Sequence, residues 1–292
     1  MPHRSNASTR LLLALAAFAA GFAGASAYAG PPSRPVVVEL FTSQGCSSCV
    51  PADALMGQLA ARKDVLAMSL PITYWDMLGW KDTLATDANT RRQKAYAMAM
   101  GHGGVYTPQV IVDGVQDIVG SRSAIIEAAI DARAHAIDAS SASEGGRVAE
   151  ASATVTRISS SGGDEPGASV PQHRSDPVVP VSMSETPQEM HISIGAADGA
   201  NNATVWMMHL RSAVNVAIKA GENAGRTVSY HNVVGDVRAV GVWKGPSLSL
   251  TLPRTAMAGL PHDGVAIIVQ QGAAGHVIGA FYAARPEFYP SH

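Results

Sequence analysis

The stretch VVVELFTSQGCSSCVPADALMGQLAA, residues 36–61, decides the fold of the first part of this chain. It opens with a short β-branched apolar run that only Glu39 interrupts, which predicts a strand buried on both faces. After the loop, Pro51 suits the first turn of a helix, and apolar residues then recur at helical spacing. These helix positions are Ala52, Leu55, Met56 and Leu59.

Both cysteines of the chain, Cys46 and Cys49, lie between this strand and this helix. At a helix N-terminus, unpaired backbone N–H groups and the helix dipole favour an anion, so we expect a stabilised Cys46 thiolate. Such a thiolate attacks a partner disulfide, and the second cysteine of the pair then resolves the mixed disulfide. Strand, C-x-x-C and helix in this order favour redox chemistry.

Two further features support a redox site. Glu39 lies in the strand seven positions before Cys46, and a buried acid below Cys49 would exchange protons with it during turnover. Thr107-Pro108 opens a later strand, where a cis proline would place backbone groups beside the cysteines.

The segments that follow complete an α/β unit over residues 30–137. Residues 65–72 predict a second buried strand, and 86–100 a helix with Thr86 or Asp87 as its cap and Gly101 as its stop. Residues 107–121 predict two strands joined by an Asp113-Gly114 hairpin turn. A last helix has one apolar face. The face consists of Ile126, Ala129, Ile130, Ala134 and Ile137.

The N-terminal residues 1–29 have the pattern of a cleaved signal peptide. Arg4 and Arg10 precede an Ala/Leu-rich run, and Ala27-Tyr28-Ala29 fits a small-residue cleavage site. We therefore expect an exported protein, periplasmic or secreted, in a compartment where disulfides persist. No later stretch approaches the length of a membrane span, so none is expected after cleavage.

The second half of the chain differs in composition. Residues 138–177 are rich in Ser, Ala, Gly and Pro and predict a flexible linker. Residues 178–284 contain short alternating or β-branched segments separated by turns, which predict an all-β, sandwich-like domain, followed by a tail at 285–292. The seven predicted strands are 178–184, 190–196, 203–210, 213–220, 247–252, 264–271 and 276–283.

Four segments together resemble a known family. VVVELFTSQGCSSC, YWDMLGWKD, VYTPQVIVDG and GENAGRTVSYHNVV are similar to the exported thioredoxin-like family catalogued as domain of unknown function 1223. The resemblance implies a thioredoxin-like fold with Cys46 as nucleophile, Cys49 as resolving cysteine and Thr107-Pro108 as a substrate-facing loop. Val50 stands where the family usually has proline, and Pro71 and Thr73 where it has His and Asp.

Three alternatives stand beside the redox hypothesis. A structural disulfide would close only a very small loop and gain little from it. A Cu(I) chaperone would use Cys46 and Cys49 with His102, from a segment that also carries Met98 and Met100. A non-catalytic adaptor would keep the fold and lack turnover.

The charge balance, two tryptophans and one polar segment say less about the function. With 21 basic and 23 acidic residues and no Lys/Arg block, the sequence does not indicate nucleic-acid binding. Trp75 and Trp80 fit either a substrate groove or the core. The polar segment at 221–234 fits a turn or a docking element, and we favour the turn. We predict a thiol–disulfide oxidoreductase without cofactor that acts on exported protein thiols or disulfides.

Overall fold

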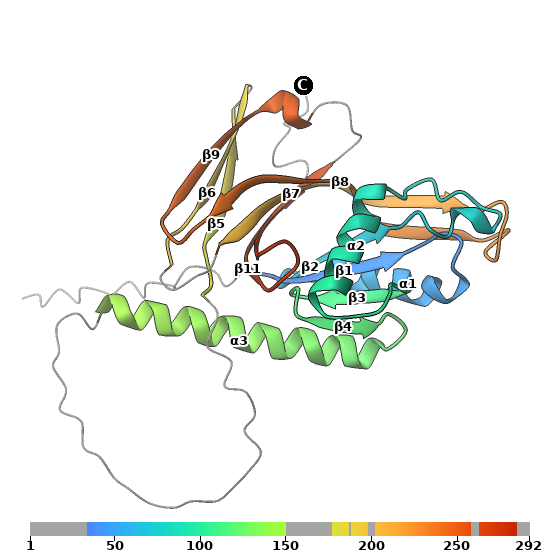
Figure 1. Ribbon diagram of the computed structural model, residues 1–292, viewed down its shortest axis with the longest axis horizontal. Helices are drawn as coiled ribbons and strands as arrows, with labels where there is room; N and C mark the ends of the chain where they lie inside the picture. Colours follow the sequence, from blue (N-terminus) through green and yellow to red (C-terminus); the bar gives the residue numbers. More distant parts are fainter. Residues whose placement is uncertain (1–33, 150–176, 187, 198–201, 258–262, 285–292) are drawn as a thin grey trace, which may run out of the picture.

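The computed structural model describes residues 34–149, 177–186, 188–197, 202–257 and 263–284. The predicted signal peptide at 1–29, most of the predicted linker and the tail at 285–292 lie outside these residues. The molecule is a mixed α/β structure with one large sheet and a second, antiparallel sheet (Figure 1). In the part of the chain that is described, no helix is both long and apolar enough to cross a bilayer.

The first half contains the predicted succession of elements. The strands and helices are β1 (Val36–Thr42), α1 (Val50–Ala60), β2 (Val65–Pro71), α2 (Asp87–Ala99), β3 (Gln109–Val112), β4 (Gln116–Val119) and α3 (Ser123–Ala149). Two short 3₁₀ turns, η1 (Ser47–Cys49) and η2 (Asp76–Leu78), lie in the loops after β1 and β2.

Local sequence explains where these elements begin and turn. Thr86 caps α2, because its side chain accepts a hydrogen bond from the Asn89 N–H. In the β3–β4 hairpin, Asp113 and Gly114 have φ of 53° and 75°, and such a pair of positive values is typical of a type I′ turn, which the Val115 N–H closes by donating to the Val112 carbonyl. The cap and the turn are as predicted.

The second half supplies the remaining strands of both sheets. They are β5 (Val181–Glu185), β6 (Glu189–Ile194), β7 (Ala203–Ala217), β8 (Thr227–Trp243), β9 (Leu248–Pro253), β10 (Gly264–Gln271) and β11 (Val277–Ala284), with a 3₁₀ turn η3 (Arg254–Met257). The large sheet has the order β11-β10-β7-β8-β2-β1-β3-β4, and the small sheet the order β5-β6-β9.

The two halves share one sheet, because β8 pairs in parallel with β2 and aligns Val233 with Ser69. The sequence did not lead us to predict β8, whose inward apolar residues alternate with Ser, His, Asp and Arg. Residues 203–210 and 213–220, predicted as two strands, form the single long strand β7 up to Ala217. A long β7–β8 hairpin therefore runs from the β-rich part into the α/β part (Figure 1).

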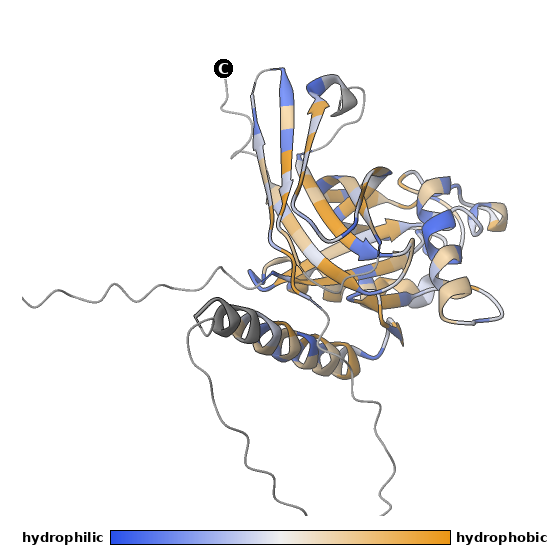
Figure 2. Cartoon of the chain, turned by 60° about the vertical axis from the view of Figure 1, so that its left-hand side comes forward, coloured by the Kyte–Doolittle hydropathy of each residue, from blue (hydrophilic) through white to orange (hydrophobic). Residues whose placement is uncertain are grey.

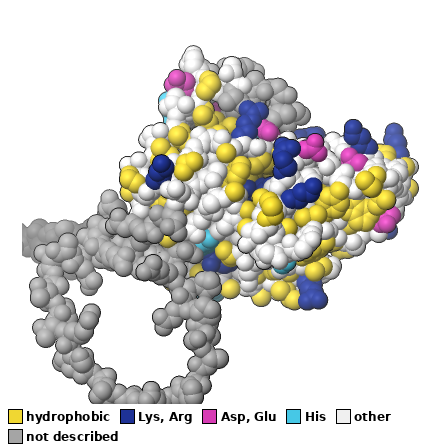
Figure 3. Space-filling model, in the orientation of Figure 1, with side chains coloured by type: hydrophobic (Ala, Val, Ile, Leu, Met, Phe, Trp, Pro, Cys, Tyr) yellow, Lys and Arg dark blue, Asp and Glu magenta, His cyan; other side chains and the backbone are white. Residues whose placement is uncertain are grey.

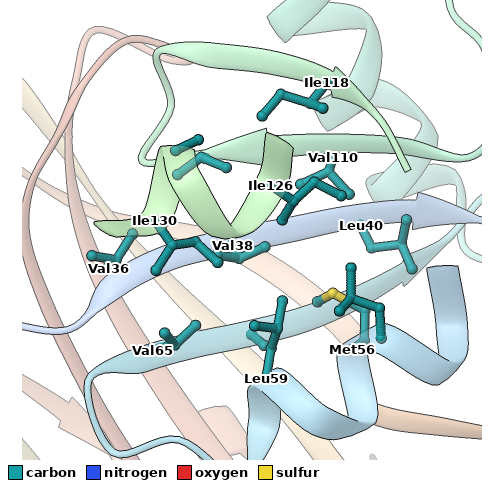
Figure 4. Packing of buried hydrophobic residues seen from close by; sticks show 14 of the residues in the cluster. Val36, Val38, Leu40, Met56, Leu59, Val65, Val110, Ile118, Ile126 and Ile130 are labelled. Carbon is teal, nitrogen blue, oxygen red and sulfur yellow. The ribbon is translucent and has the colours of Figure 1, made fainter. Parts of the chain in front are cut away.

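Apolar side chains cover both faces of the large sheet. On one face, Val36, Val38 and Leu40 of β1 pack against α1 and α3 (Figure 4). On the other face, Val37 and Phe41 pack with α2 and with strands of the second half. A third cluster lies between the two sheets, and Figure 2 shows apolar colouring along the central strands.

Helix α3 is longer than predicted. We expected it to end near residue 137 and a linker to begin at 138, but the helix continues to Ala149. Its packing face is as predicted: Ile126, Ala129, Ile130 and Ile137 are buried, and Ala134 packs against the same cluster.

A buried ion cluster ties the β3–β4 turn to three other segments. Asp113 accepts hydrogen bonds from Arg34 at 2.8 and 2.7 Å, and from Arg133 of α3 at 3.1 Å. His276, between β10 and β11, lies 3.7 Å from the same carboxylate. Burial alone would raise the pKa of Asp113, but the charge and hydrogen bonds of Arg34, the His276 hydrogen bond and the charge of Arg133 outweigh it. Its pKa therefore lies well below the usual range.

This cluster predicts a pH-dependent contribution to stability. A carboxyl whose folded-state pKa is depressed stabilises the fold above its unfolded pKa of about 3.9, and the contribution falls as pH drops towards the folded value. At pH 7, Asp113→Asn leaves Arg34 buried without its counter-ion and should lower the free energy of unfolding by about 3–5 kcal/mol. Urea denaturation should show a clearly smaller loss at pH 3. The exposed control Asp138→Asn should change stability by less than about 0.5 kcal/mol at either pH, and a pH-independent loss in Asp113→Asn would contradict the electrostatic explanation.

Candidate functional site

Cys46 and Cys49 form a disulfide at the start of α1, with their Cα atoms 5.3 Å apart. Cys49 ends the turn η1 and is the N-cap of α1. Both cysteine residues have a relative exposure of 0%. The C-x-x-C motif therefore lies between strand and helix as predicted, but its sulfurs are covered.

Hydrogen bonds within the motif fix the conformation of its loop. The Cys46 N–H donates to the Ser43 carbonyl and the Cys49 N–H to the Cys46 carbonyl, both at 3.1 Å. The Ser48 hydroxyl lies 3.3 Å from Cys46 Sγ. These contacts leave the N–H of Ser47 to find a partner outside the motif.

That partner comes from the tip of the β7–β8 hairpin, residues 218–226, which we call the hairpin tip. Glu222 accepts a hydrogen bond from the Ser47 N–H at 3.0 Å. The buried Asn223 side chain donates to the carbonyls of Gln44 and Cys46, at 2.9 and 3.0 Å. Of the segment 221–234 that we predicted to be a turn, only the part up to residue 226 is a turn, and the rest belongs to β8. The hairpin tip also docks on the cysteine loop, because a neutral amide can donate to two carbonyls at once.

Two tryptophans flank the cysteine loop. The Trp80 indole donates to Gln44 Oε1 at 2.8 Å, and a Cβ placed on Gly221 of the hairpin tip would lie 3.2 Å from Trp80 Cβ. A Cβ placed on Gly45 would lie 3.6 Å from Trp75 Cβ. Both tryptophans are half-buried: each lies beside the cysteine loop and also packs against a buried apolar cluster.

The peptide bond between Thr107 and Pro108 is cis, as the sequence led us to expect. Gly120 lies beside both Pro108 and the start of α1: a Cβ on Gly120 would come within 2.7 Å of Pro108 Cβ and 3.1 Å of Ala52 Cβ. Only glycine fits at position 120, and its N–H donates to the Pro108 carbonyl. The Thr107 hydroxyl is buried and interacts with the Tyr74 side chain.

Glu39 is buried, but the structure places it away from the helix that carries Cys49. Its neighbours in β1 alternate between the two faces of the sheet, and Glu39 lies on the face of α2, opposite to α1. Its carboxylate accepts hydrogen bonds from Arg92 and from the Tyr96 hydroxyl. Arg92 also donates to Gln270 of β10, so this group joins α2 to the second half.

A different buried acid lies on α1 itself. Asp53 is one helical turn after Cys49, so the two residues share a face of the helix. It has a relative exposure of 1%, and its Oδ1 accepts a hydrogen bond from Thr42 at 2.7 Å. Burial, only partly offset by this bond and reinforced by the charge of Asp82, raises the pKa of Asp53 well above its usual value. The i+4 spacing from Cys49 was the available signal.

Asp82 is a second buried acid at this end of the molecule. Its carboxylate accepts hydrogen bonds from the backbone N–H groups of Gln44, Leu84 and Ala85. Burial raises its pKa despite these bonds. Asp82 therefore helps to hold the segment just before the cysteines.

The structure does not bring His102 to the cysteines. Its Nε2 lies 3.1 Å from Asp117 of β4, and Met98 is 77% exposed on α2. Within the ranges that the structure covers, no three His, Cys, Asp or Glu side chains are grouped as a metal site. The copper set of Cys46, Cys49 and His102 is thus not assembled.

Exposed apolar side chains lie next to the cysteine loop. Met77 and Leu78 of η2 are 83% and 55% exposed, although they stand between two half-buried tryptophans. Figure 3 shows apolar side chains among charged ones over the end of the molecule that carries the β7–β8 hairpin. Such surfaces often mark contacts with other polypeptides.

The raised pKa of Asp53 predicts the sign of a stability effect. A carboxyl with a raised folded-state pKa lowers stability as pH increases from its unfolded pKa of about 3.9. Asp53→Asn removes the charge and retains an acceptor for Thr42, so the variant should unfold at higher urea than the wild type at pH 7. The gain should disappear below about pH 3.9, where Asp53 is protonated in both states. The exposed control Asp138→Asn should show no such gain, and a destabilised Asp53→Asn protein at pH 7 would contradict this account.

Solved structures from two bacteria resemble this chain. A crystal structure of a protein from Agrobacterium tumefaciens is 30% identical to it, with a TM-score of 0.65, and the match covers 90% of this chain and 100% of that one. The HBP35 protein of Porphyromonas gingivalis is 12% identical, with a TM-score of 0.51 over 90% of this chain and 78% of that one, and it is similar in fold alone. No curated protein matches the chain.

The sequence profile of one family matches most of the described molecule. The matched segments are residues 37–171 and 168–270, so they include the cysteine loop, the cis-proline loop and the hairpin tip. The chain therefore belongs to the family described as protein of unknown function DUF1223.

Proposed function

We propose that this protein is an exported thiol–disulfide oxidoreductase with a thioredoxin-like fold, which acts on thiols or disulfides of other exported proteins. The observation that carries the proposal is the Cys46–Cys49 disulfide at the start of α1, together with the cis Pro108 and with Gly120, which lies beside both Pro108 and Ala52 of α1. A reactive pair needs a helix N-terminus for the nucleophilic cysteine and a neighbouring loop for the partner chain.

The topology of the first half supports the thioredoxin-like assignment. Its four strands have the order β2-β1-β3-β4, with β1 and β2 parallel and β3 antiparallel to both of its neighbours. Helices α1 and α3 pack on one face, and α2 packs on the other. The C-x-x-C motif lies between the first strand and the first helix.

The chemistry follows from these positions. In the reduced protein, the Cys46 thiolate attacks a partner disulfide, forms a mixed disulfide and releases one partner thiolate. The Cys49 thiolate then attacks Cys46 Sγ and releases the second partner thiolate, so two electrons pass to the partner. Asp53 and Cys49 share a face of α1, whereas Glu39 lies on the opposite side of the sheet. Asp53 is therefore our proposed acceptor of the Cys49 proton.

The two cysteine variants test the reaction. Reduced wild-type protein should reduce a small disulfide-bonded protein substrate, and Cys46→Ala should abolish this activity because the attacking sulfur is gone. Cys49→Ala should instead accumulate a covalent complex with the substrate, visible by non-reducing electrophoresis and mass spectrometry. Wild-type protein that neither reduces, oxidises nor isomerises disulfides in any thiol buffer would contradict the proposal.

The Asp53 role has its own test. Asp53→Asn should still form the mixed disulfide but resolve it at least about tenfold more slowly at pH 7, the scale of general acid–base assistance. Rapid-quench kinetics of the covalent complex separates the two steps. The exposed Asp138→Asn is the matched control, and equal slowing of resolution by both variants would contradict the role of Asp53.

One observation favours a second candidate, a non-catalytic adaptor of the same fold. Both cysteine residues have 0% exposure in the disulfide form, so a partner thiol reaches neither sulfur without movement of the surrounding loop or the hairpin tip. A stable disulfide of this kind would hold the loop in shape for binding alone. The adaptor predicts partner binding that survives Cys46→Ala and no disulfide exchange in the wild type.

A further inference from the structure

Three carboxylates surround the C-x-x-C motif, and each comes from a different segment. Glu222 of the hairpin tip accepts the N–H of Ser47, at the peptide that follows Cys46. Asp82 accepts the N–H of Gln44 at 2.7 Å, two residues before Cys46. Asp53 lies one helical turn after Cys49. The motif is thus bordered by acids on its loop, helix and hairpin sides.

Across the residues that the structure describes, Glu222, Asp82 and Asp53 form no ion pair with Lys, Arg or His. Three basic residues lie nearby in sequence, and their side chains are exposed. They are Lys81, Lys219 and Arg226.

We infer that Glu222 disfavours the Cys46 thiolate and thereby makes the dithiol form of this protein an electron donor to partner disulfides. This inference rests on the proposed function and sets its direction. The partner is oxidised protein: a disulfide that is reduced to a dithiol while Cys46 and Cys49 become a disulfide.

The physical reason is that the Glu222 carboxylate and a Cys46 thiolate would compete for the same backbone N–H group, that of Ser47. A helix N-terminus lowers a thiol pKa by offering free N–H groups to the thiolate, and strongly oxidising pairs owe their potential to that stabilised reduced form. Here Glu222 occupies the N–H of Ser47, and its hydrogen bonds with Ser47 keep the pKa of Glu222 below its usual value, so it stays anionic. Burial of Cys46 disfavours the thiolate further.

To return to its reduced form, the protein must receive two electrons from a second thiol donor. Each cycle moves two electrons from the Cys46/Cys49 dithiol to the partner disulfide and leaves this protein oxidised. Two electrons must then come from a dithiol reductase of more negative potential, by the same exchange in reverse order. Oxidised partners and such a reductase are the two classes of protein that this site requires.

The test compares Glu222→Gln with Glu127→Gln in the full-length chain. Gln keeps an acceptor for Ser47 and removes the charge, while Glu127 lies exposed on α3 and matches the change in net charge. Thiolate absorbance of the reduced proteins at low salt gives the Cys46 pKa. We expect a wild-type value at or above the 8.5 of a free cysteine, a fall by a factor of about three to ten in proton affinity for Glu222→Gln, and no change for Glu127→Gln.

Equilibration with glutathione gives the matching change in potential. At pH 9, where the thiolate is populated, Glu222→Gln should shift the equilibrium towards the reduced form by up to about tenfold, or about 30 mV for two electrons. At pH 7 the shift should be smaller, because Cys46 then stays protonated in the wild type. In 1 M salt it should shrink, because exposed charges are screened.

Two results would overturn the inference: a wild-type Cys46 pKa well below that of free cysteine, or a Glu222→Gln protein that behaves like Glu127→Gln. Both measurements are equilibria that need no partner protein. They therefore separate this inference from the proposed function, which fails if the reduced protein transfers no electrons to any disulfide substrate.

Discussion

The parallel junction between β2 and β8 determines how the whole molecule is assembled. The two strands pair over a short stretch in which Ser69 aligns with Val233. Hydrogen bonds from side chains therefore add to the backbone pairing. Asn232, in a positive-φ conformation that Asn tolerates better than most residues, donates to the Ala67 carbonyl at 2.9 Å. Asn89 of α2 donates to the carbonyls of Pro71 in β2 and Val234 in β8, and so links these two strands.

This junction turns two sequence-distant parts into one sheet and extends the β7–β8 hairpin over the cysteines. Two buried polar groups reinforce it from the sides. Glu39, Arg92 and Gln270 connect β1, α2 and β10, and Asp113 connects the β3–β4 turn to Arg34, α3 and the β10–β11 loop. Breaking such buried pairs is costly because it leaves a charge without compensation. The cysteine loop itself is held by contacts from both halves of the chain, with Asp82 on one side and Glu222 and Asn223 on the other.

Local elements of the first half could be predicted because each has a local cause. The apolar run of β1, the helical spacing in α1, the Thr86 cap and the Asp113-Gly114 turn are all encoded within a few residues. The cis peptide before Pro108 was suggested by its place before a strand. The face of the sheet that a given helix covers is not encoded locally, and for this reason our prediction that Glu39 lies below Cys49 was wrong.

The second half was harder to predict for the same reason. Strand β8 contains Ser229, His231 and Asp236, whose polarity hides its alternation, and its pairing partner β2 is more than 150 residues away. The contacts of Glu222 and Asn223 with the cysteine loop span 175 and 177 residues. No spacing rule connects positions so far apart, although the polar density of residues 221–234 had marked the segment as unusual.

The distance between the motif and its hairpin tip has a consequence for the newly made chain. A protein is synthesised from its N-terminus, and early segments begin to fold before late ones exist. Until residue 223 has emerged, nothing supplies the Asn223 and Glu222 contacts, and the two cysteines face whatever surrounds the growing polypeptide. The two cysteines are therefore most accessible to foreign thiols during synthesis. They become covered once the hairpin tip and β8 have been made and have folded onto the first half.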